Sequence, residues 1–269
     1  MDFPVLKVVT GQRKMAMKRR TAMLFLGILA ALALRWGSAP GLAQSQPILV
    51  GAAVSLQPAL TEIDRLFTAR YPDIKVEYNF ANSGSLQQQV EQGAPLDVVF
   101  FAAASFMDAL AKQNLLVEGS RRDLLSNRMA LIVPANARTK VQDFADLVAE
   151  EIRVLSIGDL QAMPAGRYAQ EILTQAGVFE TLRPKMVFAS TVREILTAVE
   201  QGNADAGILF TSDAQLSNRV RVVATADPIT PIIYPVALVR DTPAGQSYLE
   251  FLTSEEAAEV FVKYGFIRL

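Results

Sequence analysis

The sequence predicts an α/β fold of two lobes, each a mixed, mostly parallel β-sheet flanked by helices. After residue 46, short apolar segments alternate with amphipathic ones, which is the pattern of a sheet whose strands are joined by helices. The alternation runs in two series, 47–127 and 128–230, and a chain of 269 residues is long enough for two cores. The segments after residue 231 have no place in the second series, so we expect them to return to the first lobe.

The first 43 residues have the layout of a secretory signal peptide. A basic cluster at 15–20 precedes an uncharged apolar run at 21–34, and a small-residue segment follows and ends near Ala43. The alternative is a permanent membrane anchor, but Arg35 ends the apolar run before the roughly 20 residues that a bilayer requires. We therefore expect cleavage near Ala43 and a periplasmic mature protein.

The mature chain divides into two predicted lobes. Lobe 1 is expected to comprise residues 44–127 plus 232–269, and lobe 2 residues 128–231. The chain would then cross between the lobes twice, and these two crossovers would form a hinge.

In the first series, apolar runs are expected to form strands at 47–54, 74–80 and 96–102, and a strand at 128–134 opens the second series. Amphipathic runs are expected to form helices at 58–72, 85–93, 105–116 and 120–127. In the first helix, Leu60, Ile63, Leu66 and Phe67 recur at three and four residues, so they form an apolar stripe that faces a sheet.

The second series repeats this pattern. Strands are expected at 153–159, 185–190, 206–210 and 219–224, and helices at 166–178 and 192–202. The chain then continues through a strand at 234–239 and ends in two helices, at 243–254 and 254–266.

Composition excludes several classes of function. The chain has no Cys and no His, so thiolate and imidazole metal sites, disulfides and His-based catalysis are ruled out. The leader holds seven of the 26 basic residues and one of the 27 acidic ones, which leaves 19 against 26, a net charge of −7. An acidic exported domain is a poor candidate for binding nucleic acid.

An enzyme of this composition would depend on carboxylates. Five of them lie near the ends of predicted strands and could form the acid pair of a hydrolase: Asp97, Asp159, Glu171, Asp205 and Asp213. Dispersed carboxylates are more often helix caps and surface charges, so we rank this reading below that of a binding protein.

Four junctions between a strand and a helix have a common character. Ser55 and Ser83 follow strands, Pro164-Ala165-Gly166 opens a helix, and Thr191 precedes another. Ser85 with Gln88, and Thr191 with Glu194, fit capping boxes, which would make Val192 the first residue of its helix. Taken alone, each junction is an ordinary cap. Together they offer unpaired N–H groups to a small anion at the carboxyl ends of strands.

Several segments carry a family resemblance: "AAVSL", "FANSGSLQQQVEQGAPLDVV", "PAGRYAQEIL", "STVREILTAVEQGNADAGILFTSDA" and "FVKYGF". In order and over nearly all of 47–269, they resemble the periplasmic molybdate-binding proteins of ABC transporters. This resemblance implies a type II periplasmic binding protein fold that clamps an oxyanion between two lobes.

By position, the resemblance implies that Ser55 and Ser83 each give a hydroxyl and a backbone N–H to the oxyanion, and that Ala165 and Val192 each give a backbone N–H. The family commonly has a Tyr at the end of the strand "AGILF", where this chain has Phe210. A second "AAAS", at 102–105, is expected to make no ligand contact.

The implied function is capture of molybdate, and of tungstate too, for delivery to an ABC transporter permease by a monomeric binding protein. Such a protein is no enzyme, needs no cofactor, and holds molybdenum as an oxyanion rather than as a bare metal ion. The nearest alternative is another tetrahedral oxyanion such as sulfate.

Overall fold

The structure is a computed structural model that describes residues 47–269. The predicted signal peptide, with cleavage near Ala43, lies outside the described residues. Within 47–269, no helix combines the length and apolar character that crossing a bilayer requires.

The first sheet has six strands in the order β11-β4-β10-β3-β1-β2. Their bounds are Ile48–Ala53 (β1), Val76–Ala81 (β2), Val98–Phe100 (β3), Arg122–Ser126 (β4), Ile233–Leu238 (β10) and Ile267–Arg268 (β11). β1 pairs in parallel with β2 and β3, whereas β10 pairs antiparallel with β3 and β4. The last strand, β11, also pairs antiparallel with β4. The sheet is therefore mixed.

The second sheet has five strands in the order β7-β6-β8-β5-β9. Their bounds are Met129–Pro134 (β5), Leu155–Gly158 (β6), Met186–Ala189 (β7), Ala206–Phe210 (β8) and Val220–Ala226 (β9). β6 pairs in parallel with β7 and β8, and β5 pairs antiparallel with β8 and β9. This sheet too is mixed.

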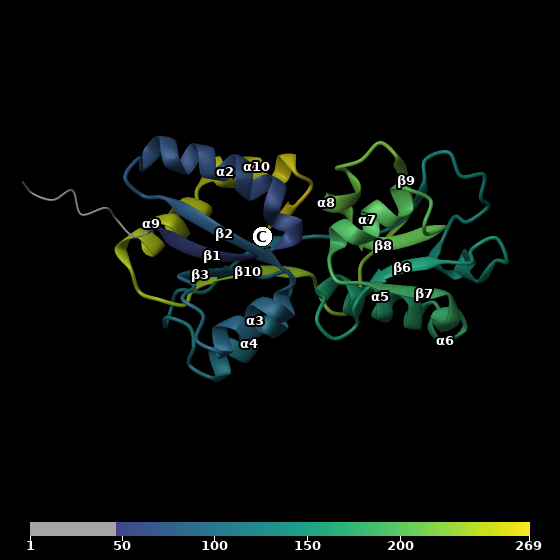
Figure 1. The fold of residues 1–269 in the computed structure, drawn as a ribbon, viewed down its shortest axis with the longest axis horizontal. Helices are drawn as coiled ribbons and strands as arrows, with labels where there is room; N and C mark the ends of the chain where they lie inside the picture. Colours follow the sequence, from purple (N-terminus) through teal and green to yellow (C-terminus); the bar gives the residue numbers. More distant parts are fainter. Residues whose placement is uncertain (1–46) are drawn as a thin grey trace, which may run out of the picture. The chain divides into compact units, whose positions relative to one another are not determined.

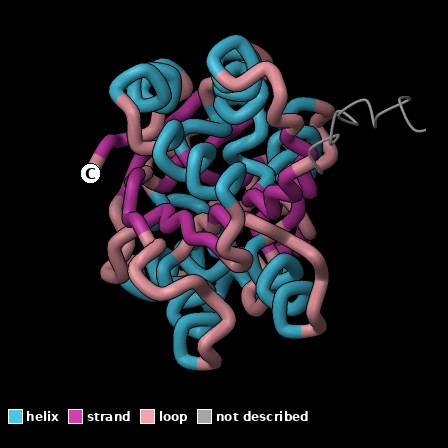
Figure 2. Tube along the Cα trace, turned by 90° about the vertical axis from the view of Figure 1, so that its left-hand side faces the viewer, coloured by secondary structure: helices cyan, strands magenta, loops and turns pink. Residues whose placement is uncertain are grey.

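Helices cover both faces of each sheet (Figure 1). Those of the first sheet are α2 (Gln57–Arg70), α3 (Ser83–Glu91), α4 (Ala104–Lys112), α9 (Pro243–Leu252) and α10 (Glu255–Lys263), preceded by a 3₁₀ turn, η1 (Val54–Leu56). Those of the second are α5 (Pro164–Gln175), α6 (Phe179–Leu182), α7 (Val192–Glu200) and α8 (Thr211–Ala214), with short 3₁₀ turns at η2 (Phe144–Val148) and η3 (Arg183–Lys185). Figure 2 shows the strands between layers of helix. The predicted class, two mixed sheets flanked by helices, is thereby confirmed. The sheets are not mostly parallel as predicted, because β10 and β11 in the first sheet and β5 in the second pair antiparallel with their neighbours.

The apolar stripe of α2 shows why these segments are helices. Pro58 stands in its first turn, where a missing N–H does no harm. Leu60, Ile63 and Phe67 are fully buried, whereas the positions between them are half-buried or exposed. The Phe67 ring packs edge-on against Tyr248 of α9, with ring centroids 5.0 Å apart. A helix from the start of the described chain and one from its end thus share one core.

The chain passes from the first sheet to the second between β4 and β5, and returns between β9 and β10. All strands of the second sheet lie between these two crossovers. The fold class therefore includes the two predicted crossovers.

The prediction of a helix over 120–127 is wrong. Residues Arg122–Ser126 form β4, which lies between β10 and β11. β11 was not predicted either. Both errors have one cause. β4 pairs with β10 and β11, more than a hundred residues later in the chain, and such distant pairing leaves no local periodic signal.

Candidate functional site

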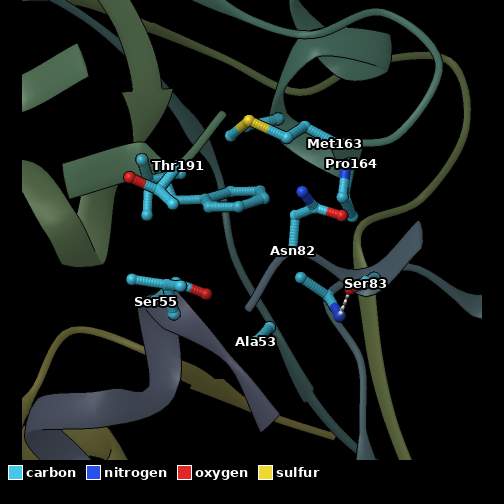
Figure 3. A pocket seen from close by; sticks show the side chains of 12 residues that line it. Ala53, Ser55, Asn82, Ser83, Met163, Pro164 and Thr191 are labelled. Atoms are coloured by element: carbon cyan, nitrogen blue, oxygen red, sulfur yellow. Dashed lines mark hydrogen bonds between the residues drawn. The ribbon is translucent and has the colours of Figure 1, made fainter. Parts of the chain in front are cut away.

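One pocket lies at the junction of the two sheets' helices and strand ends. It has an empty volume of about 260 Å³ and is lined by twelve residues: Ala53, Val54, Ser55, Asn82, Ser83, Ala102, Met163, Pro164, Ala165, Thr191, Val192 and Phe210. In Figure 3, Ser55 and Ser83 lie on one side of the central space, with Thr191, Met163 and Pro164 on the other. The five residues that the family resemblance singled out all line this pocket: Ser55, Ser83, Ala165, Val192 and Phe210. None of the twelve is charged.

Strand register brings the two serines together. β1 and β2 run parallel and in step to their ends, where Ala53 pairs with Ala81. Ser55 and Ser83 each lie two residues beyond those ends, so they emerge side by side at the same edge of the sheet. Ser55 is in the turn η1 and Ser83 is the first residue of α3.

The same arrangement in the second sheet supplies the opposite wall. β6 and β7 are parallel, and Gly158 pairs with Ala189 at their ends. α5 begins at Pro164 after β6, and α7 begins at Val192 after β7. The N–H groups in the first turn of a helix have no partner within the helix, and the helix dipole makes that end positive. Ala165 and Val192 are both in such a turn.

Two glycines allow α5 to begin so close to β6. A Cβ on Gly166 would lie 2.4 Å from the carbonyl oxygen of Gly158, and one on Gly158 would lie 2.8 Å from the Gly166 nitrogen. Such contacts are too short for any side chain. Because neither glycine has a side chain, the first turn of α5 can lie against the end of β6. Its N–H groups therefore reach the pocket.

Both serine hydroxyls have a hydrogen-bond partner within the protein. Ser83 Oγ accepts from the backbone N–H of Ala102 at 3.0 Å, the dashed line in Figure 3. Ser55 Oγ lies 3.3 Å from the hydroxyl oxygen of Tyr234. A hydroxyl has one proton to donate. Since the Ser83 oxygen is engaged as an acceptor, its proton is available to a pocket ligand.

The second "AAAS", at 102–105, lies beside the site, and the prediction that it makes no ligand contact stays a prediction. Ala102 lines the pocket, and its N–H donates to Ser83. The segment follows β3, the neighbour of β1 in the sheet, so its end reaches the same edge. Ala102 thus holds the Ser83 hydroxyl through a backbone hydrogen bond, a role that no sequence motif indicates.

The cap of α3 differs from the prediction. The N-cap is Asn82, whose Oδ1 accepts from the Ser85 N–H at 2.7 Å, so Ser85 lies inside the helix and not at its start. Asn is as good a cap as Ser, and it stands at the end of the strand. Asn82 also lines the pocket, and sequence reasoning missed it.

The cap of α7 is at the predicted residue, but the predicted capping box is incomplete. Thr191 is the N-cap of α7, its Oγ1 accepts from the Glu194 N–H at 3.2 Å, and Val192 is the first helical residue. The Glu194 carboxylate turns back to the backbone N–H of Ser190 at 2.8 Å, one residue before the position that a capping box requires.

Phe210 ends β8 and is 1% exposed. Its ring meets Tyr168 and Tyr234 edge-on, with centroids 6.3 Å and 5.6 Å away. Phe210 therefore forms an apolar patch of pocket wall held between two tyrosines.

The carboxylates considered for a hydrolase do not line this pocket, and most have structural partners. Asp97 accepts from the Leu49 N–H and pairs with Arg240, and Asp159 caps the turn before α5. Glu171 accepts from the Thr230 N–H, and Asp205 from those of Arg153 and Val154.

Asp213 is buried. Its Oδ2 is the one buried side-chain nitrogen or oxygen atom in 47–269 without a hydrogen-bond partner. Burial raises its pKa to about 7. Residues 47–269 contain no cluster of Asp and Glu suited to a metal ion.

Three hydrogen bonds join the elements of the two sheets beside the pocket. The Gly84 N–H donates to the Ala162 carbonyl at 3.1 Å, and Asn82 Nδ2 to the Ser190 carbonyl at 3.4 Å. Arg167 donates to Ser105 Oγ at 3.1 Å, with its guanidinium 4.8 Å from the centre of the Phe106 ring. Arg167 of α5 thus has partners from α4. The two walls are closed against each other around the pocket.

This arrangement suits a small ligand that accepts hydrogen bonds. The polar groups on the wall are hydroxyls, one amide and the N–H groups of helix starts. Such a shell favours an anion without charged side chains, and it contains no base or nucleophile pair for catalysis.

Residues 48–267 match the protein family described as bacterial extracellular solute-binding protein. The molybdate-binding protein ModA of Escherichia coli is 34% identical over 260 residues, which cover 93% of this chain and 99% of that protein. The solved periplasmic molybdate-binding protein of Azotobacter vinelandii has a TM-score of 0.72 at 19% identity, covering 82% of this chain and 98% of that one. The sulfate-binding protein SubI from Mycobacterium tuberculosis has the same TM-score at 17% identity, covering 82% and 86%. The two structural likenesses concern the fold alone.

Proposed function

This chain belongs to the family of bacterial extracellular solute-binding proteins, and on that premise we propose that it captures molybdate, and tungstate too, and delivers it to an ABC transporter. The observation that carries the proposal is the pocket itself: a small, uncharged wall of neutral donors at four helix starts and turns. A fully deprotonated oxyanion has acceptors and no proton to give, so a shell of donors complements it.

The proposed contacts follow from the position of each residue. Ser55 and Ser83 donate through their hydroxyls and backbone N–H groups, and Ala165 and Val192 donate through backbone N–H groups. The last two are hydrophobic and buried, so their side chains fix the helix starts rather than touch the anion's charge. Phe210 forms apolar wall where a tyrosine hydroxyl would add one more donor.

Sulfate is the competing ligand, because a sulfate-binding protein has the same fold. Sulfate and molybdate are both tetrahedral dianions, so the shell of donors alone does not separate them. The 34% identity to a molybdate-binding protein over nearly the whole chain favours molybdate.

The surroundings of this function are also proposals. We place the lobe boundaries at 127/128 and 231/232, which is supported by the assignment of β1–β4, β10 and β11 to one sheet and β5–β9 to the other. The protein acts as a monomer in the periplasm after cleavage of the 1–43 signal peptide, and closure of the two lobes around the anion is the signal to the membrane permease.

Isothermal calorimetry of the purified protein with molybdate, tungstate, sulfate and phosphate tests the ligand, with thermal shift as a second readout. Molybdate and tungstate should bind and raise the melting temperature, because a ligand that binds the folded state stabilises it. If sulfate binds tightly and molybdate does not, sulfate is the ligand instead of molybdate. If none of the four anions binds, the pocket is not an oxyanion site.

A further inference from the structure

A chain of buried polar groups lies behind the pocket wall at Ser55. It runs from Ser55 through Tyr234 to Asn127, and these residues are 4%, 0% and 3% exposed. Tyr234 and Asn127 do not line the pocket. Tyr234 belongs to β10, and Asn127 lies in the first crossover, between β4 and β5. The register of β10 against β4 shifts between Tyr234 and Pro235, an irregularity of the kind that re-aims a side chain.

The orientation of the Asn127 amide is fixed by its neighbours. Its Oδ1 accepts from the Arg128 N–H at 2.9 Å and from the Thr211 hydroxyl at 2.8 Å. The Nδ2 group has two protons, and it donates to Ser212 Oγ at 2.8 Å and to the Tyr234 hydroxyl at 3.4 Å. A flipped amide would put nitrogen opposite donors, so Asn127 presents a proton to Tyr234.

The direction of the next hydrogen bond follows from this. Tyr234 accepts from Asn127, so its own proton is left to donate, and Ser55 Oγ lies 3.3 Å away. Burial raises the pKa of the Tyr234 hydroxyl well above its ordinary value, so the group keeps its proton. Ser55 Oγ then accepts from Tyr234, as Ser83 Oγ accepts from the Ala102 N–H. Ser55 is left with its proton free for the pocket.

We propose that Asn127 and Tyr234 are positioning residues of the site: they hold the Ser55 hydroxyl as a donor that points into the pocket. The inference rests on the proposed function, since it concerns a hydroxyl assigned to the anion. We call the hydrogen-bonded chain Asn127–Tyr234–Ser55 the relay. Each residue in it donates to the next, from Asn127 in the crossover through Tyr234 of β10 to Ser55 and then to the ligand. Both pocket serines thus have one lone pair engaged by the protein and their single proton left to donate to the ligand.

A double-mutant cycle tests the relay by calorimetry with molybdate, using wild type, Tyr234→Phe, Ser55→Ala and the double variant. Phenylalanine removes the tyrosine hydroxyl and retains the ring that packs on Phe210. Tyr234→Phe should weaken molybdate binding about fivefold, the worth of one neutral hydrogen bond. In the Ser55→Ala background the same change should have no further effect, because Tyr234 acts through Ser55.

Anion selectivity distinguishes the proposed role of Tyr234 from a merely structural one, because a merely structural residue would not change the ratio of affinities for two anions. Without the Tyr234 hydroxyl, no protein donor fixes the orientation of the Ser55 hydroxyl, so it can rotate and turn a lone pair toward a proton on the ligand. The ratio of molybdate affinity to hydrogen phosphate affinity should therefore fall in Tyr234→Phe. Tyr248→Phe is the matched control: it removes another fully buried tyrosine hydroxyl, which pairs with Tyr78 away from the pocket, and it should leave the ratio unchanged.

Equal weakening by Tyr234→Phe with and without Ser55, or no weakening at all, would overturn the relay. If Tyr234→Phe does not fold, Asn127→Ala breaks the chain at its other end and takes its place in the cycle, with the same expectation. Failure of the proposed function is a separate outcome. If wild type binds sulfate and not molybdate, the ligand is wrong and the cycle is read with sulfate. If wild type binds none of the anions, the site and the relay are both rejected.

Discussion

At the scale of single residues, Ser83 combines two roles. Its hydroxyl oxygen accepts from the buried Ala102 N–H at 3.0 Å, and its proton is free for the pocket. Ser83→Ala should weaken molybdate binding by about 1–3 kcal/mol, since a donor to a charged ligand is lost. The melting temperature should also fall, because the Ala102 N–H loses its partner.

Calorimetry and thermal unfolding of Ser83→Ala measure these two effects separately. Ser85→Ala is the control, since Ser85 lies on the same helix outside the pocket lining. Unchanged affinity in Ser83→Ala would place the anion elsewhere.

Phe210 is the other residue whose change separates hypotheses. Its ring lines the pocket between Tyr168 and Tyr234. Phe210→Tyr should tighten molybdate binding about fivefold, because a hydroxyl adds one neutral donor to the shell. Phe188→Tyr makes the same change on an exposed ring of β7 and should leave affinity as it is. No gain in Phe210→Tyr would mean that the existing donors already satisfy the anion.

At the scale of elements, the start of α3 forms a close contact with the segment before α5. The Gly84 N–H donates to the Ala162 carbonyl at 3.1 Å, and a Cβ at Gly84 would lie 2.7 Å from that oxygen and 2.9 Å from the Ala162 Cα. Backbone atoms do not yield as a flexible side chain does. The missing side chain therefore lets the two walls meet.

Gly84→Ala should separate helix stability from closure. Alanine favours a helix over glycine by roughly 0.5–1 kcal/mol, so the ligand-free protein should keep or gain stability. Molybdate binding should weaken at least tenfold, because the closed arrangement is blocked. Urea unfolding without ligand and calorimetry with it measure the two effects. Wild-type affinity in this variant would mean that binding does not need this contact.

Elements also show what periodicity can and cannot reveal. The amphipathic pattern of 192–202 predicts α7 to its first residue, because burial of one face and a threonine cap are local properties. The segment 120–127 misleads because β4 exists through pairing with β10 and β11, more than a hundred residues later. In the same way, Ser85 resembles a cap, and only the end of β2 decides that Asn82 has that role.

At the scale of the whole molecule, Asp213 links stability to pH. It is fully buried, and desolvation raises its pKa from its ordinary value of 3.8 to about 7. Between pH 3.8 and about pH 7, Asp213 is therefore protonated in the folded state and ionised in the unfolded state. This contribution to stability is complete below pH 3.8 and is lost as pH rises to about 7. A shift of this size is on the order of 4 kcal/mol.

Asp213→Asn should remove this pH dependence, because asparagine does not titrate. Urea unfolding between pH 4 and pH 8 should show the free energy of unfolding falling in wild type through this contribution, and falling less in the variant. Asp227→Asn, which changes an exposed carboxylate, should retain the wild-type slope. The same slope in wild type and Asp213→Asn would contradict the assignment.

The sequence by itself determined the alternation of strand and helix, the α/β class, the exclusion of His and Cys chemistry, and five residues that line one pocket. These follow from local pattern, from composition and from a resemblance carried by short motifs. Only the tertiary structure decided that β4 is a strand, that Ala102 supports Ser83, and that Tyr234 and Asn127 stand behind Ser55. Their partners lie 19 to 179 residues away in the chain, so contact arises from sheet register and chain crossing. A sequence specifies such contacts only through the fold.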